Sequence, residues 1–255
     1  IILQSTLTRG PVFGVNYKQP VFSWNGRSIL VKATIAGKSG IYKLTASGFN
    51  PELSIERSGI AWPVLSPDGQ TVMFSDTTLG FRLHIKKPDE TIEEVSLKNG
   101  SSISAKNLLW SEDNRLVFQG CATWLSEPNT CGVWVTNANN LEPQLIIDNQ
   151  EVYPMSARAR WLAYMSRDNG DWEIYIMPLD GGAAIKLTDN DFEDGLLTIS
   201  PDGNTVAYIS NESGTWGLWT ISIAGQNKKH WFDIDSGRGT IDTDQWSKER
   251  MSWRR

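Results

Sequence analysis

Histidine is the first residue type to examine for catalysis, and this sequence holds two, His84 and His230. A catalytic or metal site needs several chemically active groups to converge, and these two lie far apart along the chain in separate strand-like stretches. A Gly-x-Ser-x-Gly sequence, which would indicate the nucleophilic serine of an α/β-hydrolase, is absent. We therefore expect no catalytic residue among these types. We also expect no cofactor, and the one metal ion we consider is a structural Ca²⁺.

That Ca²⁺ candidate comes from two acidic stretches, because carboxylate oxygens are the ligands that Ca²⁺ prefers. One stretch carries Asp189, Asp191 and Glu193, and the other is Asp168-Asn-Gly-Asp171. Neither has the spacing of an EF-hand loop with its distal glutamate. We interpret both as solvated turns and keep Asp189, Asp191 and Glu193 as the candidate ligands.

The two cysteines, Cys121 and Cys131, are flanked by the apolar runs 116–118 and 133–135. A hairpin between these runs would place the cysteines opposite each other, and a disulfide closing so short a loop contributes about 2–3 kcal/mol. A metal site is the alternative, but no histidine or further cysteine lies nearby to complete four ligands. We favour the disulfide, which indicates an oxidising, extracytoplasmic compartment.

Composition excludes two classes of partner. The 255 residues carry a formal net charge of −5, with lysine and arginine scattered along the chain, so a nucleic-acid partner is not expected. No apolar run approaches the roughly 20 residues that cross a bilayer, so this segment is not expected to insert into a membrane. The N-terminus lacks the features of a signal peptide, and we expect a processed protein or an excised domain.

Tryptophan is abundant, with 12 residues. Those at strand-like positions are expected to pack in the core: Trp110, Trp134, Trp172, Trp216, Trp219 and Trp231. A carbohydrate-stacking surface would instead need exposed rings, for which Trp24, Trp62 and Trp124 are the better candidates. We favour structural packing over sugar binding.

An internal repeat steps through the whole chain. Anchor serines stand at positions 23, 66, 111, 156, 200 and 247, which gives spacings of 43, 45, 45, 44 and 47 residues. The clearest copies read Ser-Pro-Asp-Gly from Ser66 and Ser200, a turn sequence followed by alternating apolar residues. Six copies at this period indicate an all-β, six-bladed β-propeller of four-stranded antiparallel blades, forming a single domain over residues 1–255.

Two repeats depart from the pattern. The fourth has Ala157-Arg158-Ala159 where Pro-Asp-Gly is expected, which leaves the geometry of its turn open. The sixth stops after its first strand and part of a second. The segment Leu3–Thr8 precedes the first repeat and is expected to supply the outer strand of this last blade, which would remove a free sheet edge.

These repeats resemble the TolB-like, or PD40, family of WD40-like propellers. The best match is Leu162-Ala-Tyr-Met-Ser-Arg-Asp-Asn-Gly-Asp-Trp-Glu-Ile-Tyr-Ile-Met-Pro-Leu-Asp-Gly181. The resemblance covers the whole chain at the level of the repeat, through turn and packing residues. It implies a propeller fold and one of several functions, since the family includes periplasmic interaction proteins, propellers attached to peptidases, and sugar-acid lyases with a histidine-rich metal site that this chain does not reproduce.

In a propeller, the loops before each first strand surround the channel mouth and usually carry function. Aligning the repeats on their serines gives the candidate binding residues at this mouth: Tyr17, Lys18, Trp62, Lys106, Glu151, Asp194 and Asp242. Lysines and carboxylates around an aromatic ring suit a protein or peptide partner. The alternative is that these charges pair with one another or with water.

We therefore hold two functional hypotheses. The first is a non-catalytic interaction or ligand-sensing module, expected to be monomeric, from the extracytoplasmic part of a larger bacterial protein. The second is a hydrolase or lyase acting on a sugar or peptide, with Glu151, Asp194 and Asp242 as acid and base.

Overall fold

Antiparallel strands make up nearly all the regular structure of the chain. The computed structural model describes residues 2–3, 6–7, 17–45, 50–97, 100–122, 130–168, 170–234, 241, 243, 246 and 249–253. It divides into two units, Gln4–Gln150 and Ile1–Leu3 with Glu151–Arg255, which we describe one at a time. The helix seen in the described residues, η1 (Thr77–Leu79), has three residues, and no described helix could cross a membrane.

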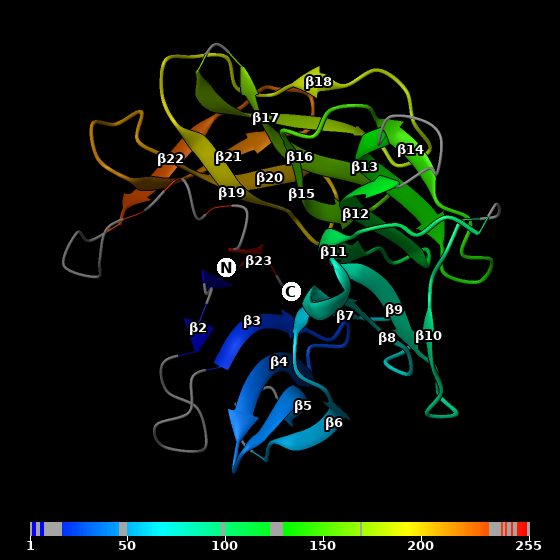
Figure 1. Ribbon diagram of the computed structural model, residues 1–255. Helices are drawn as coiled ribbons and strands as arrows, with labels where there is room; N and C mark the ends of the chain where they lie inside the picture. Colours follow the sequence, from blue (N-terminus) through cyan, green and yellow to red (C-terminus); the bar gives the residue numbers. More distant parts are fainter. Residues whose placement is uncertain are drawn as a thin grey trace. The chain divides into compact units, whose positions relative to one another are not determined.

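The unit Gln4–Gln150 contains three sheets (Figure 1). The first is β2 (Thr6–Leu7), β3 (Tyr17–Phe22), β4 (Ser28–Ile35), β5 (Lys38–Thr45) and β6 (Glu52–Glu56). The second is β7 (Ile60–Leu65), β8 (Val72–Asp76), β9 (Arg82–Lys86) and β10 (Ile92–Glu94). The third is β11 (Lys106–Trp110), β12 (Arg115–Ala122), β13 (Thr130–Asn137) and β14 (Gln144–Ile147). In each sheet, strands that follow one another in sequence are neighbours.

The other unit contains two four-stranded sheets and one two-stranded sheet. The first is β15 (Val152–Arg158), β16 (Trp161–Asp168), β17 (Asp171–Pro178) and β18 (Ile185–Lys186). The second is β19 (Asp194–Ile199), β20 (Thr205–Ser210), β21 (Gly217–Ser222) and β22 (Lys229–Asp233). The two-stranded sheet pairs β1 (Ile2–Leu3) with β23 (Met251–Ser252). The all-β, antiparallel prediction is confirmed.

The anchor serines hold the turn between the first and second strands of a sheet. The Ser200 N–H donates to the Thr205 carbonyl at 2.8 Å, and the Thr205 N–H donates back to the Ser200 hydroxyl at 3.0 Å. The same hydroxyl donates to Asp202 at 2.5 Å. Gly203 closes the turn with φ at 76°, a conformation that favours glycine. Ser66 makes the same set of contacts, so the repeated sequence is a repeated turn.

The fourth repeat lacks the Pro-Asp-Gly sequence and has a shorter turn in its place. Arg158 pairs directly with Trp161, and the two residues between them, Ala159 and Arg160, have φ of 49° and 70°. Two left-handed residues in a two-residue loop are typical of a type I′ hairpin, whose twist matches that of the flanking strands. Freed from its turn, the Ser156 hydroxyl accepts the Ile199 N–H of the next sheet at 3.1 Å.

The N-terminal segment contributes to two different sheets. Ile2 pairs with Ser252 and Leu3 with Met251, so residues from the start of the chain do pair with the last repeat. Thr6 pairs instead with Lys18, at the edge of the first sheet. The prediction that Leu3–Thr8 as a whole completes the last blade is therefore wrong for Thr6–Leu7.

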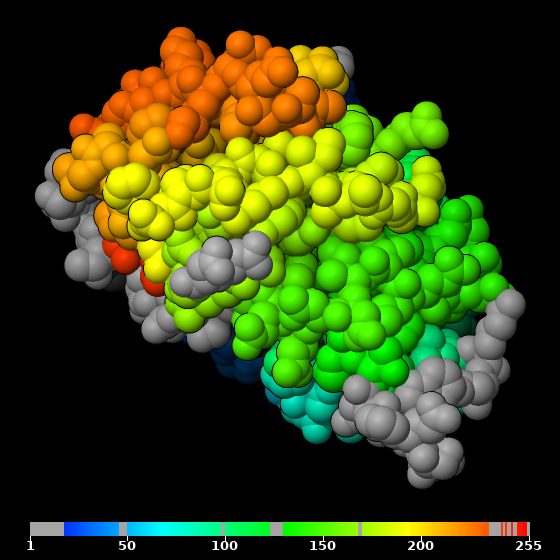
Figure 2. Space-filling view, turned by 90° about the horizontal axis from the view of Figure 1, so that it is seen from above, coloured from blue at the N-terminus to red at the C-terminus, as the bar shows by residue number. Residues whose placement is uncertain are grey.

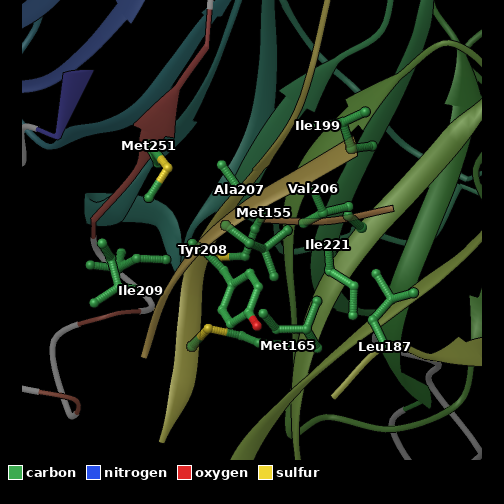
Figure 3. Close-up of a cluster of buried hydrophobic side chains, with 14 of the residues drawn as sticks. Met155, Met165, Leu187, Ile199, Val206, Ala207, Tyr208, Ile209, Ile221 and Met251 are labelled. Atoms are coloured by element: carbon green, nitrogen blue, oxygen red, sulfur yellow. The ribbon is translucent and has the colours of Figure 1, made fainter. Parts of the chain in front are cut away.

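The core of the unit that contains Glu151–Arg255 lies between its sheets. Figure 3 shows Met155, Met165, Ile199, Tyr208 and the other labelled side chains of β15, β16, β19, β20, β21 and β23 meeting in one cluster. Trp246 is fully buried, and its ring lies against Gly195, where an added Cβ would come within 2.1 Å of two ring atoms. Glycine is therefore required at position 195.

The cysteines form the predicted disulfide. Cys121 in β12 and Cys131 in β13 are directly opposite in the hairpin register, with their Cα atoms 4.0 Å apart. Of the six tryptophans expected in the core, Trp110, Trp134 and Trp172 are buried and Trp216 and Trp219 are partly buried. The sixth, Trp231, is 54% exposed, so that prediction is wrong for an outer strand.

Candidate functional site

A β-bulge with a left-handed residue lies close to the start of four strands, β3, β7, β11 and β19. In β3, β7, β11 and β19 the register shifts by one residue at this point. The bulge residues have φ between 46° and 52° although none is glycine: Gln19, Trp62, Asn107 and Leu196. Bulges of this kind re-aim side chains next to functional sites, and non-glycine residues in left-handed backbone cost about 1–3 kcal/mol each. These four strands therefore hold strain at their bulges, and Trp62 is the bulge residue that is also a predicted binding residue.

Side chains from three sheets of the unit Gln4–Gln150 meet at this bulge end. The backbone N–H of Trp62 donates a hydrogen bond to the Gln19 Oε1 atom of the preceding sheet at 2.8 Å. The Trp62 ring packs against Phe81 with 5.7 Å between centroids. The Lys106 ammonium lies over the Phe81 ring, 4.3 Å from its centroid. We call Gln19, Trp62, Phe81 and Lys106 the Trp62 cluster.

The Trp62 cluster is partly open to solvent, and one of its hydrogen-bond donors lacks an acceptor among the described residues. All four of its side chains are half-buried. The Trp62 Nε1 atom is buried and has no hydrogen-bond acceptor among the described residues. A buried N–H group normally has a partner, and none of the described residues supplies one for this indole. A cation–π contact such as that of Lys106 contributes about 0.5–1 kcal/mol at an exposed site.

Of the predicted residues in this unit, three can be placed. The structure brings Trp62 and Lys106 together through Phe81. Lys18 is exposed and stands beside the bulge residue Gln19. Phe81 was missed because it belongs to the connection before β9 and not to a first strand. Tyr17 begins β3, but its side chain is outside the described residues, as is the whole of Trp124.

Asp194 does not belong to an open binding surface, which corrects the prediction made for it. It is fully buried at the start of β19, where the Asn190 amide donates to its Oδ2 atom at 2.8 Å. Burial raises the pKa of Asp194 to about 6, hydrogen bonds from Ser210 and Asn190 oppose this rise, and the nearby Glu173 carboxylate adds to it. A carboxylate that no substrate can touch is not the acid or base that the enzyme hypothesis requires.

The other carboxylates of that hypothesis give it no further support. Glu151 is exposed and directly precedes β15, and Asp242 is outside the described residues. Two of the candidate Ca²⁺ ligands have other partners. Asp189 pairs with Lys186 at 2.5 Å, and Glu193 accepts a hydrogen bond from the Trp172 backbone N–H at 3.2 Å. Within the described part of the chain, no three His, Cys, Asp or Glu residues are grouped to hold a metal ion.

Both histidines are in local structural contacts. His84 is buried, stacks on Phe74 with 5.5 Å between centroids, and its Nδ1 atom lies 3.1 Å from the Arg82 carbonyl oxygen. His230 packs against Trp219 at 4.6 Å, with its Nε2 atom 3.0 Å from an Asp233 carboxylate oxygen. They lie in different units of the chain.

A second group of exposed aromatic rings lies on an outer strand. Trp231 and Phe232 in β22 are 54% and 56% exposed. Figure 2 shows the orange segment that contains β22 at the surface of the molecule. The Trp231 ring is held in place by the Lys229 ammonium, 3.8 Å from the ring centroid, and by a 2.9 Å hydrogen bond from its Nε1 atom to Thr220.

Comparison with known proteins shows what the chain is similar to. No protein-family model matches it. It is 25% identical over 251 residues to the Tol-Pal system protein TolB of Francisella tularensis subsp. tularensis (strain WY96-3418), an alignment that covers 91% of this chain and 54% of that protein. It is 23% identical over 221 residues to the uncharacterized protein Atu1656 of Agrobacterium fabrum, covering 84% of this chain and 60% of that protein. The chain thus spans a little over half the length of these curated relatives.

Solved structures agree on the fold. A putative TolB from Agrobacterium tumefaciens superposes with a TM-score of 0.59 at 17% identity, over 86% of this chain and 81% of that one. The β-propeller domain of the trilobed protease from Pyrococcus furiosus gives a TM-score of 0.62 at 14% identity, over 89% and 84%. An oligogalacturonate lyase in complex with manganese gives 0.66 at 15% identity, over 92% and 73%. The chain thus has the fold of a β-propeller, and its relatives and serine-anchored repeats are similar to those of TolB proteins.

Proposed function

We propose that this chain is a non-catalytic interaction module that binds a protein or peptide through the Trp62 cluster. The observation that carries this proposal is the left-handed backbone at Trp62 and Gln19, with φ of 47° and 50°. Such strain persists only where the surrounding structure imposes it, and it gathers at ligand-binding positions. Trp62 is held there by a hydrogen bond from its N–H to Gln19 and by packing on Phe81.

The chemistry of the cluster suits a protein partner. A half-buried tryptophan offers the kind of aromatic anchor that carries much of the binding energy at protein interfaces, and the nearby lysine contributes to a polar rim. The relatives named TolB in the Tol-Pal system are consistent with such a role.

An enzymatic role in sugar or peptide cleavage is the second hypothesis, and the fold likeness to an oligogalacturonate lyase is what favours it. The burial of Asp194 removes one of its three carboxylates from contact with any substrate. We therefore propose the interaction module ahead of the enzyme.

The interaction proposal is tested with Trp62→Ala and with Trp231→Ala as the matched control, an exposed tryptophan on an outer strand. The intact chain is used as bait for bacterial envelope extract, and each retained protein is purified and its affinity for the chain measured by biolayer interferometry. We expect Trp62→Ala to weaken binding at least tenfold, as for a central aromatic anchor, and Trp231→Ala to leave it within twofold. Equal binding by both variants, or no retained protein, would refute the proposal.

We also propose that the six repeats form one six-bladed domain, with the last blade completed from the N-terminus. The antiparallel pairing of β1 with β23 supports this completion. We propose an extracytoplasmic location as well, which the Cys121–Cys131 disulfide supports because disulfides are typical of oxidising compartments. Alkylation of the protein in its host, followed by mass spectrometry, tests the location: free thiols on the freshly isolated chain would contradict it.

A further inference from the structure

A pocket of about 350 Å³ opens in the unit Gln4–Gln150, beside the end of the first sheet where β3 begins and β4 ends. Residues from β3, β4, β5, the connection between β6 and β7, and the start of β7 line it. Three cationic side chains, those of Lys18, Lys32 and Arg57, are among them. The pocket is distinct from the Trp62 cluster, since neither Trp62, Phe81 nor Lys106 contributes to its wall.

The two lysines are forced together by the register of the sheet. Lys18 and Lys32 are directly opposite in the β3–β4 pair, so their side chains point to the same face. Like charges at such a position are destabilising, and Lys32 is also half-buried. Burial, and after it the charge of Lys18, lowers the pKa of Lys32. The sheet therefore holds an ammonium group that is partly removed from water and faces a second positive charge.

Among the described residues, the carboxylate that pairs with a cation of the pocket is that of Asp76, and its partner is Arg57. Arg57 pairs with the fully buried Asp76 at 2.6 Å. Burial opposes ionisation of Asp76, but hydrogen bonds from Thr78 and the charge of Arg57 hold its pKa below the ordinary value. Among the described carboxylates none forms an ion pair with Lys18 or Lys32. As far as the described residues show, this positive pair is therefore uncompensated in a concave site.

Neutral donors surround these cations. The hydroxyls of Thr34 and Ser39 are 2.7 Å apart in the wall, and Ser58 contributes a third hydroxyl. Gly59 also lines the pocket, with φ at 75°, and a Cβ at this position would come within 2.5 Å of the Thr78 methyl group. Carboxylate and phosphate oxygens accept hydrogen bonds from ammonium groups and hydroxyls such as these.

We propose that this pocket binds an oxyanion, the carboxylate or phosphate group of a ligand. The group sits between Lys18 and Lys32 and is oriented by the hydroxyls of the wall. Its negative charge offsets the repulsion between Lys18 and Lys32. The proposal does not depend on protein binding at the Trp62 cluster.

The test is isothermal titration calorimetry of the intact chain with inorganic phosphate and with a short peptide, prepared with a free or an amidated C-terminus. Lys32→Met and Lys18→Met are the variants, and Lys43→Met, an exposed lysine of β5 outside the pocket, is the matched control. We expect saturable binding by the wild type, at least tenfold weaker binding by each pocket variant, and a change within twofold for Lys43→Met. Binding of phosphate alone identifies a free anion as the ligand, while discrimination between free and amidated peptide identifies a carboxylate of a chain.

Thermal unfolding separates loss of the site from loss of the fold. Because a bound ligand stabilises the native state, phosphate should raise the Tm of the wild type and of Lys43→Met but not that of Lys32→Met. Without ligand, Lys32→Met should unfold at the same or a higher temperature than the wild type, since one partner of a repulsive pair is gone. The proposal fails if neither probe binds up to about 10 mM at low ionic strength, where charges are least screened, or if Lys32→Met binds as tightly as the wild type.

Discussion

Replacing Asp194 with asparagine should stabilise the protein at neutral pH. Burial raises the pKa of Asp194 from its ordinary value of 3.8 to about 6. A difference of about two pH units corresponds to about 3 kcal/mol between the two protonation states. That figure is an upper bound for the cost of an ionised carboxylate at this position, and an amide of the same shape does not incur it.

The pH dependence follows from the direction of this pKa change. Between about pH 4 and pH 6 the unfolded chain loses the Asp194 proton while the native chain keeps it, so the free energy of unfolding falls as pH rises. Above about pH 6 both states are ionised and the cost is constant. Below about pH 3 both are protonated and Asp194 contributes nothing. The advantage of Asp194→Asn over the wild type should therefore grow from pH 4 to pH 6 and then level off.

Urea unfolding of both proteins at a series of pH values measures this difference, since subtracting one curve from the other cancels every group that titrates identically in both. Asp202→Asn is the control of opposite sign: the exposed Asp202 has its pKa lowered by the Ser200 hydroxyl, so its replacement should reduce stability at pH 7. A wild-type minus Asp194→Asn difference that stays flat from pH 4 to pH 7 would refute the argument from burial.

Three further outcomes can be tested by thermal or chemical unfolding. Gly195→Ala should destabilise the protein by about 1–3 kcal/mol or more, because its Cβ would overlap the buried ring of Trp246; an unchanged Tm would contradict the packing described. Reduction of Cys121–Cys131 should cost about 2–3 kcal/mol for so short a loop, checked by unfolding with and without dithiothreitol, and no change would mean that the hairpin is held without it. Ser200→Ala should cost about 1–2 kcal/mol because a backbone N–H of the turn loses its acceptor, and wild-type stability would show that water replaces the hydroxyl.

Features that depend on neighbouring residues could be predicted from the sequence. The Ser-Pro-Asp-Gly turn at Ser66 and Ser200 uses hydrogen bonds among residues at most five positions apart, so its sequence determines its structure. The disulfide followed from two short runs around Cys121 and Cys131 for the same reason. Repetition of such local units then indicated the fold.

The candidate site depends on contacts between sheets, and sequence patterns carry little information about those. All six residues of β19 are buried, so no alternation of polar and apolar residues distinguishes a surface Asp194 from a buried one. Nothing in the residue type of Trp62 indicates left-handed backbone, which β-branched and bulky residues rarely adopt. Phe81 joins the site from a connection at a different place in the repeat.

The hydrogen bond from the Trp62 N–H to the Gln19 side chain has a consequence for how the sheets open. A bulge leaves an N–H outside the ladder of its own sheet, and here the preceding sheet supplies the acceptor. Hydrogen exchange at the Trp62 amide therefore reports the opening of the first sheet as well as the second. Ser156 accepts the Ile199 N–H in the same way between two sheets of the other unit. Sheets that would otherwise unfold independently are in this way joined into larger cooperative units.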